Sequence, residues 1–505
     1  MKYAFSTGNA RRDGSRAIAR RVPPVALGLA LATALVALPE PSLANGRFPR
    51  AERLIESASS ADELTIAATY GLVVTHDRGK TWQQICEPAF ALQSGYSGDP
   101  LFDLAPGGTM VVSVQSSFNV SPDHGCQWNR TLGGGGGGRG EEVIDFTISR
   151  STKTLIAAVA TGTGTGLVNG LRVSSDDGLT WSALGAPIPM PTVLTLYVSP
   201  SDPSRIYASG LSATNEGVFA VSSDRGATWA TLEIPGTNLD EIPFIAAVHP
   251  TDPSKVFVRT DAWKDRDVID TANDALLVTS DAGKTWKEVI RGGAKLLGFA
   301  LSPDGASMRI GYGDPVDSSR LVDSASFGIW SGSTADLKVS QIYDQAVTCL
   351  TWSKSGLYVC TSAEASGGLE VAFAPGGDLG AGGASLKPLL RRTDVKGTVE
   401  CCPGTTAAVC AIEWLTTCET FATCGAEVDA GPRVCGGTNG TPAGADAGAT
   451  GPDGGDDATA SGVVKASCAC RVGPGRAGST AGGAGALGAL VAASLVVRRR
   501  GRRRA

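Results

Sequence analysis

Five aspartates in the sequence share one local pattern, and carboxylates repeated in this way could act as acids or bases, bind calcium, or hold a turn. The pattern is an octapeptide that reads THDRGKTW at 75–82, SPDHGCQW at 121–128, SSDDGLTW at 174–181, SSDRGATW at 222–229 and TSDAGKTW at 279–286. In each copy, the first Ser or Thr and the Asp two positions later can accept hydrogen bonds from turn amides.

The other two constant residues of the octapeptide also suit a turn. The glycine permits a positive φ that other residues resist, and the tryptophan offers a large apolar face to pack between sheets. We therefore predict a structural turn in each copy rather than a catalytic or calcium-binding site. The residues concerned are Asp77, Gly79, Trp82, Asp123, Gly125, Trp128, Asp176, Gly178, Trp181, Asp224, Gly226, Trp229, Asp281, Gly283 and Trp286.

Other residues that could carry catalysis are scarce. The chain has three histidines. His76 and His124 occupy variable positions of the octapeptide and His249 precedes a proline, so we expect all three to be solvated. No HExxH or GxSxG pattern is present, and the glycine run at 133–138 lacks the Lys-Ser/Thr of a phosphate-binding loop. The sequence therefore predicts no catalytic residue, no cofactor and no metal ligand.

The elements that position the octapeptides are short strands. The tryptophans are 46, 53, 48 and 57 residues apart, which suits a blade of four strands plus turns. The segment 195–234 shows four such strands, TLYVSP, RIYASG, GVFAVS and TWATLEI, separated by turn residues. Two further four-strand segments, at 296–343 and 347–390, lack the octapeptide. We predict an all-β fold, a seven-bladed β-propeller over residues 50–395, with six or eight blades as the alternatives.

The octapeptide resembles the Asp-box, or BNR repeat, of sialidases, sortilin-type receptors and the photosystem assembly-factor propellers. The resemblance implies that each copy joins the third and fourth strands of a blade, away from any active site. Sialidases add an arginine clamp for a carboxylate, a Tyr–Glu pair, an acid and an F-R-I-P type motif. This sequence lacks that motif, since Arg47-Phe48-Pro49-Arg50 has a different order.

The resemblance therefore favours a non-enzymatic propeller that binds a protein or glycan partner. A divergent sialidase-like glycoside hydrolase is the alternative, and a purely structural coat component is a third reading. Three convergent arginines beside a Tyr–Glu pair in the central funnel would favour the enzyme.

The two ends of the chain indicate export and attachment. Residues 1–44 have a basic start, an apolar run at 25–38 and the small-x-small site Ser42-Leu43-Ala44, so they are predicted to form a signal peptide. Residues 436–467 are rich in Gly, Ala and Asp and are predicted to be a disordered linker. We therefore expect the protein at the cell surface or outer membrane.

Residues 468–505 contain Cys468 and Cys470, an apolar run at 481–497 and six closing arginines. This arrangement resembles the MYXO-CTERM sorting signal of myxobacterial surface proteins. The resemblance implies that Cys468 or Cys470 is the processing or anchoring position. A permanent C-terminal membrane helix is the alternative, because 17 helical residues just span a bilayer.

The charge distribution disfavours nucleic acid as a partner. Six basic residues lie before residue 45 and eight lie after Cys470, so the body of the chain is much more acidic than its net charge of −5. An acidic body without a basic stripe repels phosphate backbones.

Twelve cysteines in an exported chain predict disulfides. Counting back from a turn at Lys354-Ser355 places Cys349 opposite Cys360, within disulfide reach. The alternative is that each of them pairs with a distal cysteine cluster. Cys86 and Cys126 form a possible further pair.

The distal cluster lies in a cysteine-rich module predicted at 396–435. Three bridges within it would allow 15 connectivities, and zinc is the alternative. The cysteines concerned are Cys401, Cys402, Cys410, Cys418, Cys424 and Cys435. A short helix within 401–424 would place Ala411, Trp414, Leu415 and Cys418 on one face.

Overall fold

A computed structural model describes residues 50–424, apart from residues 59, 93–99, 115, 135–139, 164–165, 265–270, 315–323, 362–368 and 421–423. The predicted signal peptide, the linker at 436–467 and the C-terminal signal with Cys468 and Cys470 lie outside the described residues. Among the helices that are described, none has the length and apolar character needed to cross a membrane.

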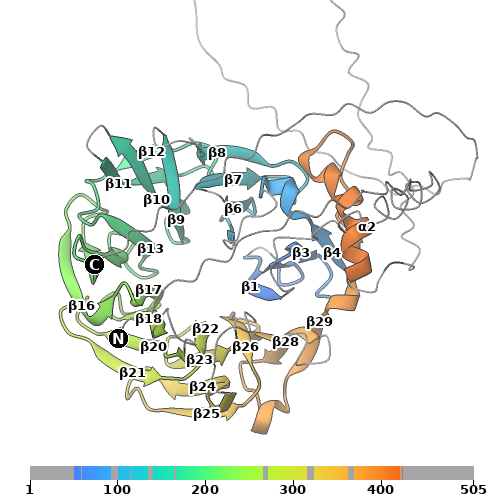
Figure 1. The fold of residues 1–505 in the computed structure, drawn as a ribbon. Helices are drawn as coiled ribbons and strands as arrows, with labels where there is room; N and C mark the ends of the chain where they lie inside the picture. Colours follow the sequence, from blue (N-terminus) through green and yellow to red (C-terminus); the bar gives the residue numbers. More distant parts are fainter. Residues whose placement is uncertain are drawn as a thin grey trace, which may run out of the picture. The chain divides into compact units, whose positions relative to one another are not determined.

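Seven antiparallel sheets, each built from four successive main strands, stand around a common centre, so the predicted seven-bladed propeller is confirmed (Figure 1).

Blade 1 comprises β1 (Ala51–Glu56), β2 (Leu64–Ala68), β3 (Gly71–Thr75) and β4 (Trp82–Ile85). Blade 2 comprises β5 (Leu101–Leu104), β6 (Met110–Val114), β7 (Ser117–Ser121) and β8 (Asn129–Gly133). Blade 3 comprises β9 (Glu141–Ser149), β10 (Thr154–Thr163), β11 (Gly166–Ser174) and β12 (Ser182–Leu184).

The remaining four blades follow the same order. Blade 4 comprises β13 (Thr192–Val198), β14 (Ile206–Leu211), β15 (Glu216–Ser222) and β16 (Ala230–Asn238). Blade 5 comprises β17 (Glu241–Val248), β18 (Val256–Lys264), β20 (Ala275–Thr279) and β21 (Lys287–Arg291), with β19 (Thr271–Ala272) beside β18. Blade 6 comprises β22 (Lys295–Leu301), β23 (Ser307–Gly313), β24 (Gly328–Ser333) and β25 (Val339–Tyr343), and blade 7 comprises β26 (Val347–Trp352), β27 (Gly356–Thr361), β28 (Leu369–Pro375) and β29 (Lys387–Arg391).

The hydrophobic core is divided among the seams between blades. Strands β2, β3, β6 and β7 are buried along their whole length because a neighbouring blade covers each face. Phe118 and Val120 of blade 2, for example, pack with Leu155 and Ala157 of blade 3. Seven such clusters occupy the seven seams, and burying this apolar surface is the main force that holds the ring together.

The ring closes between the last blade and the first. The Thr348 hydroxyl donates to the Ala51 carbonyl at 2.8 Å, and the Thr351 hydroxyl donates to the Leu54 carbonyl at 2.9 Å. Beyond blade 7, the chain adds β30 (Val395–Thr398) as a parallel fifth strand on the outer edge of β4. The chain therefore crosses its own closing seam.

Two disulfides tie this C-terminal segment to the first two blades. Cys86, after β4, pairs with Cys410, and Cys126, within the blade 2 octapeptide, pairs with Cys401. The predicted pairing of Cys86 with Cys126 is therefore wrong.

The prediction that three bridges form within the distal cluster is also wrong, because Cys401 and Cys410 pair with cysteines of blades 1 and 2. Cys418 and Cys424 do pair with each other. Cys349 and Cys360 are joined in the register expected from the sequence, directly opposite each other on β26 and β27.

The short helix in this region is α2 (Cys410–Thr420). Its packed face carries Cys410, Trp414 and Cys418, whereas Ala411 and Leu415 point to solvent. The buried face therefore differs from the predicted one. Helical periodicity defines an apolar stripe, but it does not say which edge of that stripe packs against the neighbouring blade.

Candidate functional site

The octapeptides form five equivalent hairpins between the third and fourth strands of blades 1–5. In blade 1 the Thr75 hydroxyl donates to Asp77 Oδ1 at 2.8 Å and accepts from the Gly79 amide at 2.9 Å. The Thr81 amide and hydroxyl both donate to the Asp77 carboxylate, at 2.9 and 2.8 Å. The carboxylate is thus occupied by its own turn, which is the structural role expected from the sequence.

The same bonds recur at Asp176, Asp224 and Asp281. At Asp77, partial burial acts to raise the pKa of the carboxyl, but hydrogen bonds from Thr81, Thr75 and Lys80 lower this pKa to about 2. Hydrogen bonds from Thr285 lower the pKa of Asp281 to about 2 in the same way. These carboxylates therefore remain ionised and bound within the turn.

All five hairpins lie on one rim of the ring. The Arg78 amide donates to the Asp62 carbonyl, the Arg225 amide to the Ser204 carbonyl and the Ala282 amide to the Ser254 carbonyl, at 2.8–2.9 Å. Each acceptor lies in the turn between the first and second strands of the same blade. The hairpin rim is therefore also the end of the central channel at which the first strands finish.

The hairpin backbone adopts positive φ at more positions than the sequence indicated. The glycine has a positive φ in every copy, and so does the residue before it, with φ of 57–64° at Arg78, His124, Asp177, Arg225 and Ala282. Each glycine also faces the preceding blade: a Cβ on Gly178 would lie 2.8 Å from Phe118 Cε1. The octapeptide is thus a contact between blades as well as a turn.

The five tryptophans are not equally buried. Trp82 and Trp128 are 2% and 6% exposed, whereas Trp181, Trp229 and Trp286 are half-buried on the outer side of their blades. The expected packing between sheets is therefore complete only at the first two.

The histidines differ from each other in the structure. His76 and His124 are exposed at neighbouring hairpin tips, with ring centroids 5.8 Å apart. His249 is buried, accepts from the Asp252 amide at 3.1 Å and lies 2.9 Å from the Gly305 carbonyl. The expectation that His249 is solvated is wrong, because its ring holds the turn between β17 and β18.

A large cavity runs through the central channel of the ring. It has a volume of about 870 Å³ and is lined by the first strands of all seven blades, β1, β5, β9, β13, β17, β22 and β26. The turns that follow several of these strands, at Ser151, Pro200, Pro250 and Pro303, form its mouth on the hairpin rim. No sequence motif marks these residues, since they come from seven distant segments.

Three arginines line this channel. Arg53 on β1 and Arg150 after β9 bind the two carboxylate oxygens of Asp103 on β5, at 3.2 and 2.9 Å. Arg259 on β18 instead lies over the Phe244 ring, with its guanidinium carbon 4.8 Å from the ring centroid. No carboxylate among the described residues pairs with Arg259.

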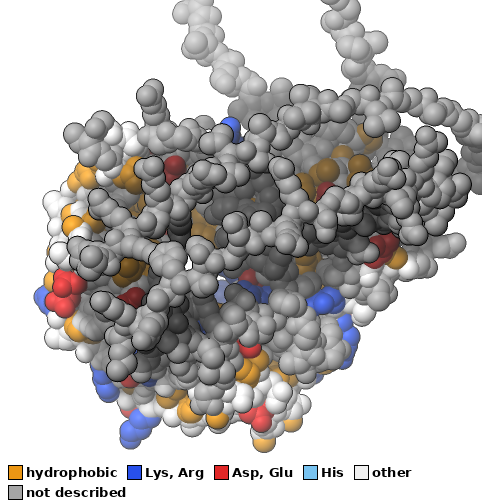
Figure 2. All heavy atoms as spheres, viewed as in Figure 1, with side chains coloured by type: hydrophobic (Ala, Val, Ile, Leu, Met, Phe, Trp, Pro, Cys, Tyr) orange, Lys and Arg blue, Asp and Glu red, His pale blue; other side chains and the backbone are white. Residues whose placement is uncertain are grey.

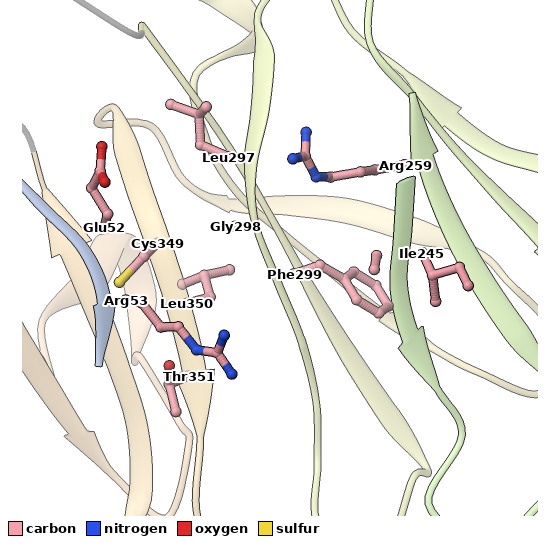
Figure 3. A pocket seen from close by; sticks show the side chains of 11 residues that line it. Glu52, Arg53, Ile245, Arg259, Leu297, Gly298, Phe299, Cys349, Leu350 and Thr351 are labelled. Carbon is pink, nitrogen blue, oxygen red and sulfur yellow. The ribbon is translucent and has the colours of Figure 1, made fainter. Parts of the chain in front are cut away.

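Arg259 and Arg53 also border a second, smaller pocket of about 180 Å³ (Figure 3). Its wall is apolar at Phe299 and Leu350, and both guanidinium groups lie within the view of the pocket. Because Arg53 is already bound to Asp103, Arg259 is the cation that could receive an anionic group of a ligand with a hydrophobic or sugar frame.

Asp145 connects two first strands inside the channel. Its carboxylate accepts from the Leu196 amide of β13 at 2.7 Å and from the Phe146 amide at 2.8 Å. Burial raises the pKa of Asp145 to about 7, against the effect of these two hydrogen bonds and of the Arg53 charge. Asp145 is partly buried and lines the channel.

A Tyr–Glu pair exists, but it lies in the closing seam. The Tyr358 hydroxyl donates to Glu56 Oε2 at 2.9 Å, and Tyr358 is 4% exposed. Glu56 lines the channel, whereas the tyrosine lies behind it between blades 7 and 1. The three arginines and this pair therefore do not converge on one point.

On the one face that Figure 2 shows, the described residues form no basic stripe. On the face in Figure 2, Lys and Arg side chains are interspersed with acidic and apolar ones wherever described residues are visible. No cluster of three His, Cys, Asp or Glu side chains suited to a metal ion occurs in the described residues.

These features define a class: the protein is a seven-bladed β-propeller with a charged central channel. Residues 169–322 match the family model described as Sortilin, neurotensin receptor 3. No curated protein sequence matches the chain.

Among solved structures, the chain is similar to an ancestral GH74 enzyme, with 14% identity, a TM-score of 0.42, and coverage of 62% of this chain and 40% of that chain. It is also similar to a Hadza microbial sialidase (15% identity, TM-score 0.33, coverage 57% and 68%) and to Saccharomyces cerevisiae Sqt1 (10%, 0.38, 66% and 83%). The chain spans less than half the length of the GH74 enzyme, and these likenesses concern the fold alone.

Proposed function

We propose that this protein is a non-enzymatic binding propeller that takes an anionic group of a protein or glycan ligand into its central channel. The observation that carries the proposal is Arg259, a half-buried cation in a cavity with an aromatic ring but no described carboxylate beside it. A half-buried guanidinium without an anion has donors that a bound carboxylate or sulfate could use.

The binding test uses two anionic probes, a fluorescent polyglutamate peptide and an oligogalacturonate, measured by anisotropy at low salt. At least one probe should bind the wild type, and Arg259→Gln should weaken that binding by at least ten-fold. Arg225→Gln is the matched control, because Arg225 is exposed at a hairpin tip outside the channel. Equal binding by wild type and Arg259→Gln, or no binding of either probe, contradicts the proposal.

The proposal includes export and attachment at the cell surface. Four disulfides among the described residues support an oxidising compartment, and the apolar run with its arginine cluster at 481–504 supports attachment. Fractionation and surface labelling of cells should find the full chain at the surface, and a variant lacking residues 468–505 should be released. Recovery of reduced protein from the cytoplasm contradicts this assignment.

A sialidase-like hydrolase is the second candidate, favoured by the presence of three arginines in one cavity. Against it, Arg53 and Arg150 are already bound to Asp103. A fluorogenic sialoside distinguishes the candidates, since turnover that is lost in Arg259→Gln would establish the enzyme and sink the non-enzymatic proposal.

A further inference from the structure

The ring of blades closes at the seam between blades 7 and 1. The four main strands of every blade are consecutive in the chain, and β30 is a later strand that joins the edge of blade 1. In such a ring, the closing seam is held only by contacts between separate sheets unless another segment crosses it. Residues 392–418, which we call the strap, are that segment.

The strap follows the outer edge of the first two blades. Its strand β30 pairs with β4, and the Val399 amide continues the pairing by donating to the Gln84 carbonyl at 2.9 Å. Further along, the Ala407 amide donates to the Cys126 carbonyl at 3.0 Å. Thr406 Oγ1 accepts from the Trp128 amide at 2.9 Å, so the strap reaches the blade 2 hairpin.

The strap also completes the hydrophobic core of two seams. Val395, Trp414 and Cys418 are buried in the cluster that joins Trp82 of blade 1 to Leu390 of blade 7. Ala407 and Cys410 are buried in the neighbouring cluster, between Phe90 and Trp128. Removal of the strap would expose apolar surface at both places.

Among the described residues, two disulfides join the strap to blades 1 and 2, and they differ in accessibility. Cys126 and Cys401 are both half-buried, close to the surface of the blade 2 hairpin. Cys86 and Cys410 are 3% and 0% exposed, beneath the strap. A reductant can therefore reach the first bridge while the strap is in place, but reaches the second only after the strap has moved.

We propose that the strap is a disulfide-secured clasp for the ring, which a dithiol opens in a fixed order, Cys126–Cys401 first and Cys86–Cys410 second. In each step, a thiolate of the dithiol attacks one sulfur and displaces the other as a thiolate, which takes up a proton. The second thiol of the reagent then closes on the mixed disulfide. Two protein thiols and one cyclic disulfide of the reagent result, a two-electron reduction.

Opening the clasp exposes the β4 edge and frees the closing seam. The hydrogen bonds from Val399 and Ala407 would be lost, together with the strap's share of the two clusters. Blades 3–6, which make no contact of this kind with the strap, would keep their structure. Reduction of the clasp would therefore open one seam without unfolding the rest of the ring.

The experiment reduces the oxidised full chain with dithiothreitol, quenches samples over time with iodoacetamide and maps the labelled cysteines by mass spectrometry. Cys126 and Cys401 should be labelled at least ten times faster than Cys86 and Cys410. Hydrogen exchange of the Val399 and Ala407 amides should accelerate at least ten-fold on full reduction, while the amides of β14 stay unchanged. Simultaneous reduction of the two bridges overturns the order, and unchanged exchange after full reduction overturns the clasp.

Paired variants sharpen the result. In Cys86→Ser with Cys410→Ser, reduction of the remaining exposed bridge should by itself release the strap. In Cys126→Ser with Cys401→Ser, the strap should stay protected until the buried bridge opens. Cys349→Ser with Cys360→Ser is the matched control, because that bridge lies within blade 7 and its loss should leave strap exchange unchanged. If a variant does not fold, the wild-type time course alone still decides the order.

Discussion

At the scale of single residues, the glycine of each octapeptide meets two separate demands. Gly178 has a φ of +87°, and a Cβ at this position would meet Phe118 of the preceding blade. Gly108 has a similar φ of +90° but open space around it, and Gly170 has neither constraint. The three positions therefore separate the effect of backbone conformation from the effect of packing.

We expect Gly178→Ala to lower the free energy of unfolding by about 2–4 kcal/mol, from left-handed backbone strain plus overpacking. Gly108→Ala should lower it by about 1–2 kcal/mol, from strain alone, and Gly170→Ala should change it little. Urea unfolding followed by circular dichroism measures all three. Equal losses in Gly178→Ala and Gly108→Ala would show that the contact with the preceding blade contributes nothing.

The tryptophans also differ at this scale. Trp82 is almost fully buried at the closing seam, so Trp82→Ala should reduce stability by about 3–5 kcal/mol. Trp229 is only half-buried, so Trp229→Ala should cost about half as much. Thermal unfolding of the two variants gives the comparison, and a larger effect at Trp229 would contradict the burial argument.

At the scale of elements, the first strands are joined by side chains that bind the backbone of the next strand. Asp145 links β9 to β13 in this way. Its pKa, raised by burial to about 7, exceeds the value of about 4 expected in the unfolded chain. The folded state therefore binds the proton more tightly, so the contribution of Asp145 is full below about pH 4 and is lost as the pH rises through 7.

Asp145→Asn cannot titrate, so the difference in unfolding free energy between variant and wild type isolates this effect. That difference should shift in favour of the variant by about 2.5 kcal/mol between pH 5 and pH 7.5, because this range covers about two of the three pKa units that separate the unfolded and folded values. Urea titrations at the two values measure it. A difference that is independent of pH would show that Asp145 does not titrate in this range.

Much of the fold could be predicted because the four main strands of each blade come from one continuous stretch of sequence. Strands, turns and octapeptides lie within about fifty residues of each other, and the Cys349–Cys360 register follows from one hairpin turn. The channel and the strap could not be predicted in the same way. Arg53, Asp103 and Arg259 are brought together by ring closure, and Cys86 carries no local sign that its partner is Cys410.

At the scale of the whole molecule, the bridges differ greatly in how far apart their cysteines are in the chain. Cys349 and Cys360 are 11 positions apart, whereas the strap pairs are separated by 275 and 324. Closing a long loop costs more conformational entropy and requires that the intervening blades be formed. The short bridge should therefore form first.

Oxidative refolding tests this order. In samples quenched with iodoacetamide, the Cys349–Cys360 peptide should appear at least ten times faster than either strap bridge. The strap bridges should appear together with the native circular dichroism signal. Early appearance of Cys126–Cys401 or Cys86–Cys410, before the blades have formed, would contradict this account of assembly.

The long sequence separation within each strap disulfide also affects the order in which its two cysteines are synthesised. Cys86 and Cys126 leave the ribosome 324 and 275 residues ahead of their partners, and for all of that time they are closer in sequence to each other than to Cys410 or Cys401. A chain exported from its N-terminus delivers these two thiols first to an oxidising compartment, where they can join incorrectly. If the chain is exported as we propose, correct maturation of this propeller would depend on a thiol–disulfide isomerase, or on oxidation delayed until blade 7 and the strap have been translocated.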